Sequence, residues 1–138
     1  MKKLFPALFL ALVLCLSSCI DEKTIKFEKL PQKAQDIVNT YFVKSNVLMI
    51  TEKTVQSGKL IEIRLNDESE LEFDGNGKLL KVDCKGGRVP DKLIPAEIMK
   101  QIQVSYPEAF VVEWKKDGNR WKAKLNNNVE MDFDEQNQ

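Results

Sequence analysis

The 138-residue sequence contains no histidine. This absence removes the side chain that most often acts as a general base or binds a metal ion in an enzyme. The sequence also lacks the glycine-rich GxxxxGK[ST] and GxGxxG patterns, whose backbone amides bind phosphate groups. We therefore expect no catalytic residue, no metal site and no cofactor, and the composition argues against an enzyme.

The first residues have the three parts of an export signal. Lys2 and Lys3 form a basic start, an apolar run from Leu4 to Leu16 follows, and Ser17-Ser18-Cys19 ends the segment with small residues. The run is shorter than the roughly 20 residues that a transmembrane helix needs. The pattern predicts a signal peptide over residues 1–18, and the alternative is an N-terminal anchor that is not cleaved.

The end of this segment resembles the lipobox of bacterial lipoproteins, in which the cysteine becomes the first residue of the mature chain. The resemblance implies diacylglycerol on the Cys19 thiol and a further acyl chain, and two chains anchor a protein stably in a membrane. We expect an exported protein that is anchored by lipid to the bacterial cell envelope, in the periplasm or on the cell surface. Residues 19–28 would form a lipidated tether.

The remainder of the chain suits a single domain. The whole sequence has 21 basic and 21 acidic residues, and removal of Lys2 and Lys3 leaves a net charge of −2. No basic stripe is present, so we expect no binding to nucleic acid. Cys84 is then the remaining thiol, which excludes an intrachain disulfide. We interpret it as a small, partly buried residue at a strand end, with an intermolecular disulfide or a nucleophile as the alternatives.

Two segments 64 residues apart, 30–42 and 94–106, have the apolar spacing of one helix face. Each begins with an apolar residue and a proline, which suits the first helical position because its missing N–H needs no partner there. Strand patterns follow each helix. The sequence therefore predicts repeat one at residues 29–83, a connector at 84–93 and repeat two at 94–138.

Hairpin loops predict how the strands pair. Asp117-Gly118 as a two-residue loop pairs Trp114 with Trp121, and Asn76-Gly77 as a type I′ loop pairs Leu71 with Val82. The strand within residues 47–55 has an unclear register, because its apolar run is unbroken. The other pairs expected are Val112 with Ala123, Phe110 with Leu125 and Phe73 with Leu80, and, on the opposite face, Lys115 with Arg120, Glu113 with Lys122 and Val111 with Lys124.

Sequential antiparallel strands beside amphipathic helices predict an α+β fold. We expect two tandem helix-plus-antiparallel-strand repeats that form one sheet, with the helices packed on one face. Alternation along the strands places charged side chains on the other face. We interpret that face as a tentative binding face, and its candidate residues are Glu62, Arg64, Glu113, Lys122, Lys124, Glu130 and Asp132.

Two groups of side chains have alternative interpretations. The carboxylates of residues 70–74 and 130–134 suggest an acid/base pair or calcium ligands, but oppositely charged neighbours favour an ordinary solvated face. Asp74-Gly75-Asn76-Gly77 resembles the start of a calcium loop but lacks the later ligands. Trp114 and Trp121 would form a sugar or peptide platform if exposed, but their place on the apolar face favours packing under the second helix.

Several motifs resemble the PepSY-like bacterial envelope proteins, whose fold is similar to that of β-lactamase-inhibitory protein. The resemblance spans most of residues 27–134 and implies tandem helix-and-sheet repeats in a secreted or lipid-anchored protein. It carries over no inhibitory residue, because no motif matches an inhibitor's contact loops. The motifs are Lys29–Gln35 with Tyr41-Phe42, Leu71–Asp74 with Asn76-Gly77, Val89-Pro90, Leu93–Pro95, Ile98–Pro107 and Glu130–Asp134.

The resemblance, with the missing catalytic residues, predicts a lipid-anchored envelope module that recognises or inhibits an envelope protein or peptide. It would bind through the open sheet face, or through a sheet edge left free at residues 130–134. One alternative is an accessory structural subunit of a larger envelope complex. The other is a hydrolase that uses carboxylates alone, which needs two of them roughly 5–10 Å apart in a cleft.

Overall fold

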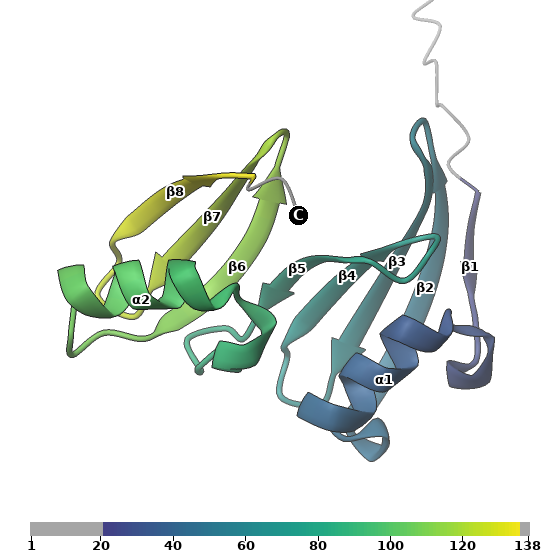
Figure 1. The fold of residues 1–138 in the computed structure, drawn as a ribbon. Coiled ribbons are helices and arrows are strands. Elements are labelled where there is room, and N and C mark those ends of the chain that lie inside the picture. Colours follow the sequence, from purple (N-terminus) through teal and green to yellow (C-terminus); the bar gives the residue numbers. More distant parts are fainter. Residues whose placement is uncertain (1–20, 136–138) are drawn as a thin grey trace, which may run out of the picture.

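The computed structural model describes residues 21–135, so the signal segment and Cys19 lie outside the described residues. The chain forms one mixed α+β unit with short 3-10 turns (η) between the main elements (Figure 1). In order, the elements are β1 (Glu22–Thr24), η1 (Phe27–Lys29), α1 (Gln32–Tyr41), η2 (Lys44–Asn46), β2 (Val47–Val55), β3 (Gly58–Leu65), β4 (Glu70–Asp74), β5 (Leu79–Asp83), η3 (Asp91–Leu93), α2 (Ala96–Ser105), β6 (Val111–Asp117), β7 (Arg120–Leu125) and β8 (Glu130–Asp134).

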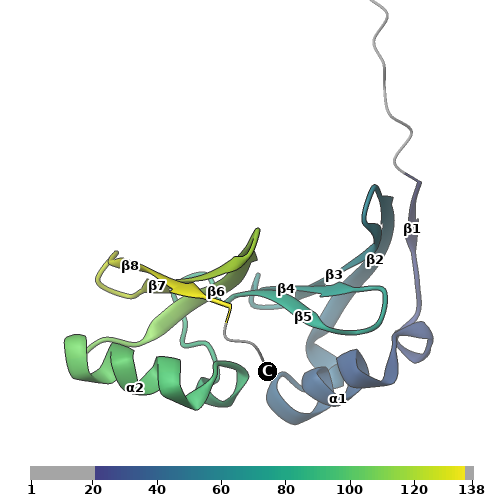
Figure 2. The same ribbon diagram turned by 45° about the horizontal axis from the view of Figure 1, so that its top comes forward.

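All eight strands belong to one antiparallel sheet in simple chain order, β1 to β8. Figure 2 shows both helices beneath the same face of this sheet, and no helix of residues 21–135 over the other face. The α+β class and the placement of the helices are therefore as the sequence predicts. We call the helix-covered side the inner face and the opposite side the outer face.

Each helix begins directly after its proline, which is not itself the first helical residue as predicted, and ends one residue before its predicted segment does, at Tyr41 and at Ser105. Pro31 and Pro95 are the N-cap residues, and each carbonyl accepts the first hydrogen bonds of its helix. The buried side of α1 carries Ala34 and Val38, and that of α2 carries Ile98, Met99 and Ile102. These side chains pack on the inner face of the sheet and close the core.

The core consists of the inward side chains of the strands. Ile61, Ile63, Leu71 and Phe73 are 2 % exposed or less, and they belong to β3 and β4. In the other half, Trp114 is 2 % exposed and stacks on Trp121, with ring centroids 4.8 Å apart and an interplanar angle of 8°. The prediction of core packing is confirmed for Trp114, and Trp121 is partly buried against the core.

The expected register of β6 against β7 is wrong by two residues. Trp114 lies opposite Ala123, Lys115 opposite Lys122 and Asp117 opposite Arg120, so the loop is Gly118-Asn119. Gly118 has a φ of +60°, and a glycine with positive φ at the first loop position is typical of a type II′ hairpin. A shift of two residues keeps every side chain on its face, which is why the core prediction survives.

A β-bulge changes the start of β6. The register shifts between Val111 and Glu113, so Val111 lies opposite Leu125 and is fully buried, although the sequence places it opposite Lys124 on the charged face. Phe110, expected opposite Leu125, lies before the strand and is half-buried. Its ring is covered by the Arg88 guanidinium at 4.9 Å.

The β4–β5 hairpin also differs from its prediction. Leu71 lies opposite Val82, as expected, but a bulge places Phe73 opposite Leu79 rather than Leu80. Gly77 alone of the expected two-residue loop has a positive φ, +83°, so the turn is a three-residue loop instead of type I′. A Cβ at Gly77 would lie 2.8 Å from that of Pro31, which shows how closely this turn packs against the start of α1.

The segment predicted as a tether contains ordered structure. Residues 22–24 form β1, which pairs with residues 51–53 of β2. Phe27 follows in η1, is 8 % exposed and belongs to the core. The globular part therefore begins before residue 29, and β1 extends the sheet beyond β2.

The turns after β3 and β7 match in detail. Glu68 and Asn128, 60 residues apart, both have a positive φ, of 71° and 66°. Leu65 N–H donates to the Ser69 carbonyl, as Leu125 N–H donates to the Val129 carbonyl, both at 2.9 Å. The starts of the helices match as well, since residues 27–29 and 91–93 both form 3-10 turns.

Candidate binding face

Charged side chains cover the outer face in rows that run across the strands. All seven residues of the predicted binding face lie on it, because each is out of phase with the buried residues of its strand. The first row consists of Arg64, Glu70, Asp83, Glu113, Lys124 and Glu130, and the second of Glu62, Glu72, Lys81, Lys115, Lys122 and Asp132.

The structure adds residues to this face that the list of candidate binding residues leaves out. Glu70, Glu72, Lys81, Asp83 and Lys115 occupy its centre. Lys81 and Lys115 are neighbours only because β5 pairs with β6 across the connector. Strand alternation after the β4–β5 hairpin is a signal that places Lys81 on this face, but no local pattern predicts the β5–β6 pairing.

Like charges lie opposite one another across the middle of the face. Glu70, Asp83 and Glu113 form an acidic stripe over β4, β5 and β6. Beside it, Lys81, Lys115 and Lys122 form a basic stripe over β5, β6 and β7. Glu113 lies opposite Lys124, and not opposite Lys122 as predicted. Directly opposed like charges destabilise a sheet, so each stripe needs counter-charges from elsewhere.

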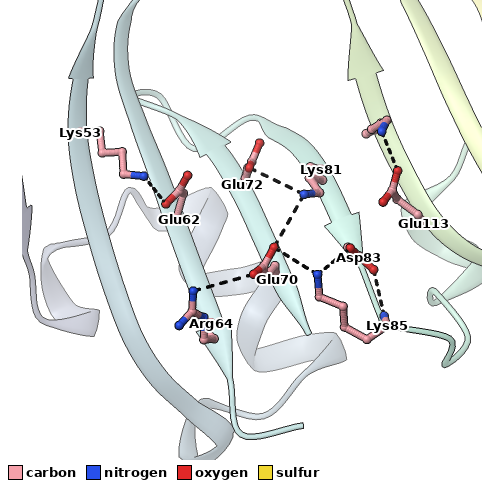
Figure 3. Close-up of polar contacts among 10 residues, drawn as sticks. Lys53, Glu62, Arg64, Glu70, Glu72, Lys81, Asp83, Lys85 and Glu113 are labelled. Atoms are coloured by element: carbon pink, nitrogen blue, oxygen red, sulfur yellow. Dashed lines mark hydrogen bonds and ion pairs between the residues drawn. The ribbon is translucent and has the colours of Figure 1, made fainter. Parts of the chain in front are cut away.

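Ion pairs within each half supply these counter-charges (Figure 3). Lys81 Nζ lies 3.7 Å from Glu70 and 4.0 Å from Glu72, and Lys85 Nζ lies 2.9 Å from Asp83 and 3.5 Å from Glu70. The remaining pairs on this face include Lys53–Glu62 at 2.8 Å, Arg64–Glu70 at 3.9 Å, Lys115–Glu113 at 2.9 Å and Lys122–Asp117 at 3.0 Å. A second macromolecule can exchange such partly exposed pairs at small energetic cost.

A hollow of about 250 Å³ lies on this face over β2, β3 and β4. Glu62, Glu70 and Glu72 line it with Arg64 and Met49. Burial raises the pKa of Glu72, and the nearby Glu62 and Glu70 carboxylates add to this shift against the opposing effect of Lys81. Within residues 21–135, no three side chains of the His, Cys, Asp and Glu types are grouped to hold a metal ion.

The contacts of Asp74 and the position of Cys84 indicate structural roles for both residues. The Asp74 carboxylate accepts hydrogen bonds from the N–H groups of Asn76 and Lys78, both at 2.9 Å, and so closes the hairpin turn. Cys84 directly follows β5 and is half-buried, with a free thiol whose pKa is raised by burial. Its position agrees with the interpretation of a small residue at a strand end.

One edge of the sheet is free along a full strand. β8 pairs with β7, and no other strand of the described chain pairs with it. The predicted free edge at residues 130–134 is therefore present among the described residues. None of the helices within residues 21–135 is long and apolar enough to span a membrane.

The fold and the face define a class of protein: a single antiparallel sheet backed by two helices on one side, with a charged, open surface on the other. The chain belongs to the family described as "Putative beta-lactamase-inhibitor-like, PepSY-like", whose model matches residues 19–81 and 59–138. This confirms the resemblance found in the sequence. No curated protein matches the chain.

Solved structures from Bacteroides are similar over most of the chain. A putative periplasmic protein from the DUF2874 family of Bacteroides vulgatus is 32% identical, with a TM-score of 0.78, covering 83% of this chain and 90% of that one. A putative calcium-regulated periplasmic protein from Bacteroides thetaiotaomicron is 33% identical, with a TM-score of 0.76 and the same coverage. A second Bacteroides vulgatus protein, described as periplasmic and of unknown function, is 27% identical with a TM-score of 0.76, covering 83% and 93%.

Proposed function

We propose that the chain is an exported, lipid-anchored binding module of the bacterial envelope that holds a protein or peptide on its outer face. The observation that carries this proposal is the outer face itself, where charged rows cross the strands and no helix of the described part of the chain covers them. The three similar Bacteroides proteins, all described as periplasmic, support an exported location. The lipobox-like segment ending at Cys19 supports the anchor.

We infer further that the chain is a duplication. The matched turns at Glu68 and Asn128, the two 3-10 turns before the helices and the two matches to the family model support this inference. Duplication of a small unit gives one continuous sheet, which buries more apolar surface than either unit alone. It also makes the outer face long enough to contact an extended partner.

The surroundings of the carboxylates favour binding over hydrolysis. A glycan hydrolase needs one carboxylate that gives a proton and another that attacks or activates water, both aimed into a cleft. Glu62 and Glu70 instead form ion pairs with basic neighbours, at 2.8 Å from Lys53 and 3.5 Å from Lys85. The hollow that they line holds about 250 Å³ and is lined by residues of three neighbouring strands of the sheet. We therefore propose a protein that binds its partner without catalysis.

Photocrosslinking in intact cells tests the binding face. A photoreactive residue in place of Lys124, on the outer face, should give discrete products with one envelope protein. The same residue in place of Lys100, an exposed position on α2, is the matched control and should not. Products of equal yield from both positions would contradict an outer binding face and would favour the alternative of an accessory subunit enclosed in a larger complex.

Cell fractionation tests the anchor. Cys19→Ala removes the thiol that would carry the lipid, so the protein should leave the detergent-soluble membrane fraction. Cys84→Ala is the control and should leave the distribution unchanged. Retention of the Cys19→Ala protein in membranes, with an unprocessed N-terminus, would instead indicate an N-terminal anchor that is not cleaved.

A further inference from the structure

The outer edge of β8 has the form of a site for an added strand. We propose that it pairs with an extended segment of an envelope protein in which lysine or arginine alternates with apolar residues. This inference deepens the proposed function, because it rests on the chain being a binding module and names the chemistry of its partner.

The backbone of β8 is oriented for this pairing. Leu125 N–H donates to the Val129 carbonyl at 2.9 Å, and Glu135 N–H donates to the Asn119 carbonyl at 3.3 Å. Since alternate residues of a strand direct their backbone groups to opposite edges, residues 129, 131, 133 and 135 face β7. The N–H and C=O groups of Glu130, Asp132 and Asp134 therefore point to the free edge.

In the first half of the chain, β4 has the second strand partner that β8 does not have among residues 21–135. β4 has the sequence Glu-Leu-Glu-Phe-Asp and β8 has Glu-Met-Asp-Phe-Asp, and each pairs with the preceding strand in the same register. On its other edge β4 carries β5, with Val82 opposite Leu71 and Lys81 opposite Glu72. The Asp74 N–H donates to the Lys78 carbonyl at 2.9 Å, so the corresponding even-numbered residues of β4 face β5.

The side chains of β8 select the chemistry of the segment. Glu130, Asp132 and Asp134 lie on the outer side and are exposed, whereas Met131 and Phe133 lie on the inner side against the core. Oppositely charged residues directly across a strand pair are stabilising, and apolar residues prefer apolar neighbours. The matching segment thus has basic residues facing the three acids and apolar residues facing Met131 and Phe133.

Electrostatics disfavours a second copy of this chain at the same edge. Antiparallel pairing of β8 with β8 would place acidic residues opposite acidic residues along the outer face, which is destabilising. Acidic side chains on an edge also protect a protein from self-association through that edge. The same charges that repel a second β8 attract a basic strand.

Peptide binding to the full-length protein in mild detergent tests the proposal. The probe is a fluorescent peptide with the core Lys-Leu-Lys-Val-Lys, and its acidic counterpart has Glu for each Lys. Three Lys residues would face Glu130, Asp132 and Asp134, so the basic probe should bind and the acidic one should not. N-methylation of the Lys amides should abolish binding, whereas N-methylation of the Leu and Val amides, which point away from β8, should leave it.

Substitution at Asp132 separates the backbone from the charge. Asp132→Pro removes an N–H that points to the free edge and not to β7, and edge strands tolerate proline with that orientation. It should lower the probe's affinity by at least about tenfold, the loss expected from missing strand hydrogen bonds. Asp132→Asn keeps the N–H and should weaken binding by a smaller factor that vanishes at high salt.

The outcomes distinguish this inference from the proposed function. Probe binding that is indifferent to Asp132→Pro or to the methylated amides would overturn strand addition. If Asp132→Pro also leaves the photocrosslinks from position 124 in cells unchanged, the proposal of a binding module is kept and the proposal of an edge site is rejected. If the basic peptide does not bind and the photoreactive residue at Lys124 gives no crosslinked product, both the edge site and the proposed binding module are rejected. If the protein self-associates and Asp132→Pro abolishes that self-association, the occupant of the edge is a second copy of this chain and not a basic strand of another protein.

Discussion

β4 and β8 have nearly identical sequences but lie in different surroundings. Both pair with the preceding strand in the same register, but only β4 has a strand on its other edge among the described residues. Phe73 is fully buried as a result, whereas Phe133 is 8 % exposed. The matched outer carboxylates differ as well, since the side chain of Glu72 is 28% exposed and that of Asp132 is 43% exposed. Position in the sheet, and not local sequence, sets these differences.

The largest expected difference between β4 and β8 is the loss of stability when Phe73 or Phe133 is replaced by alanine. Phe73→Ala leaves a cavity in the core and should lower the free energy of unfolding by about 3–5 kcal/mol. Phe133→Ala removes the same ring from a partly open strand, where neighbours can relax and water can enter, and should cost about 2–3 kcal/mol. Urea unfolding of both variants measures the difference. Equal losses would mean that β8 is as well packed as β4.

A smaller effect is expected at the matched turns. Glu68 has a φ of 71° and Asn128 a φ of 66°. A side chain such as Glu is strained in this left-handed region, whereas Asn tolerates it. Glu68→Gly should therefore stabilise the protein by about 0.5–1 kcal/mol, after the extra flexibility that glycine gives the unfolded chain is subtracted. Asn128→Gly should be neutral or slightly destabilising.

Thermal unfolding measures both glycine variants. Glu68→Ala is the control, because alanine keeps the Cβ that causes the strain and should give no gain. Stabilisation by Glu68→Ala equal to that by Glu68→Gly would point to the lost charge instead of the backbone as the cause.

The inner face could be predicted from sequence because its signals are local. The apolar spacing of residues 30–42 and 94–106 predicts both helices, and alternation predicts which strand residues are buried. The stacking of Trp114 on Trp121 agrees with that prediction even though the register is shifted by two residues. Side chains alternate between the two faces along a strand, so an error of two residues in the predicted register leaves every residue on its predicted face.

The details of the outer face could not be predicted, because they depend on pairing across loops. The bulge between Val111 and Glu113 turns Val111 inward, and no composition rule marks it. The opposition of Lys81 and Lys115 follows from β5–β6 pairing, which spans the connector. The candidate residues were assigned to the right face, but Glu113 was given the wrong partner, and the acidic and basic stripes were missed.

The smallest effect concerns pH and the partly buried carboxyl of Glu72 on β4. Burial raises the pKa of Glu72 above its usual value, so the folded state binds this proton more tightly than the unfolded state does. Stability from this group is present below the unfolded pKa and is lost as the pH rises through the folded pKa. Ionised Glu72 therefore lowers stability at neutral pH. Glu72→Gln keeps the shape of the side chain, removes the charge and should modestly raise the unfolding temperature at pH 7.

The same substitution should bring no gain at pH 3.5, where Glu72 is protonated in both states. The comparison between pH 7 and pH 3.5 cancels effects of the amide that do not depend on ionisation, and Asp132→Asn provides the corresponding change on the edge strand. A gain of equal size at both pH values would show that repulsion and burial of the Glu72 charge do not limit stability, and that the ion pair with Lys81, 4.0 Å away, compensates them.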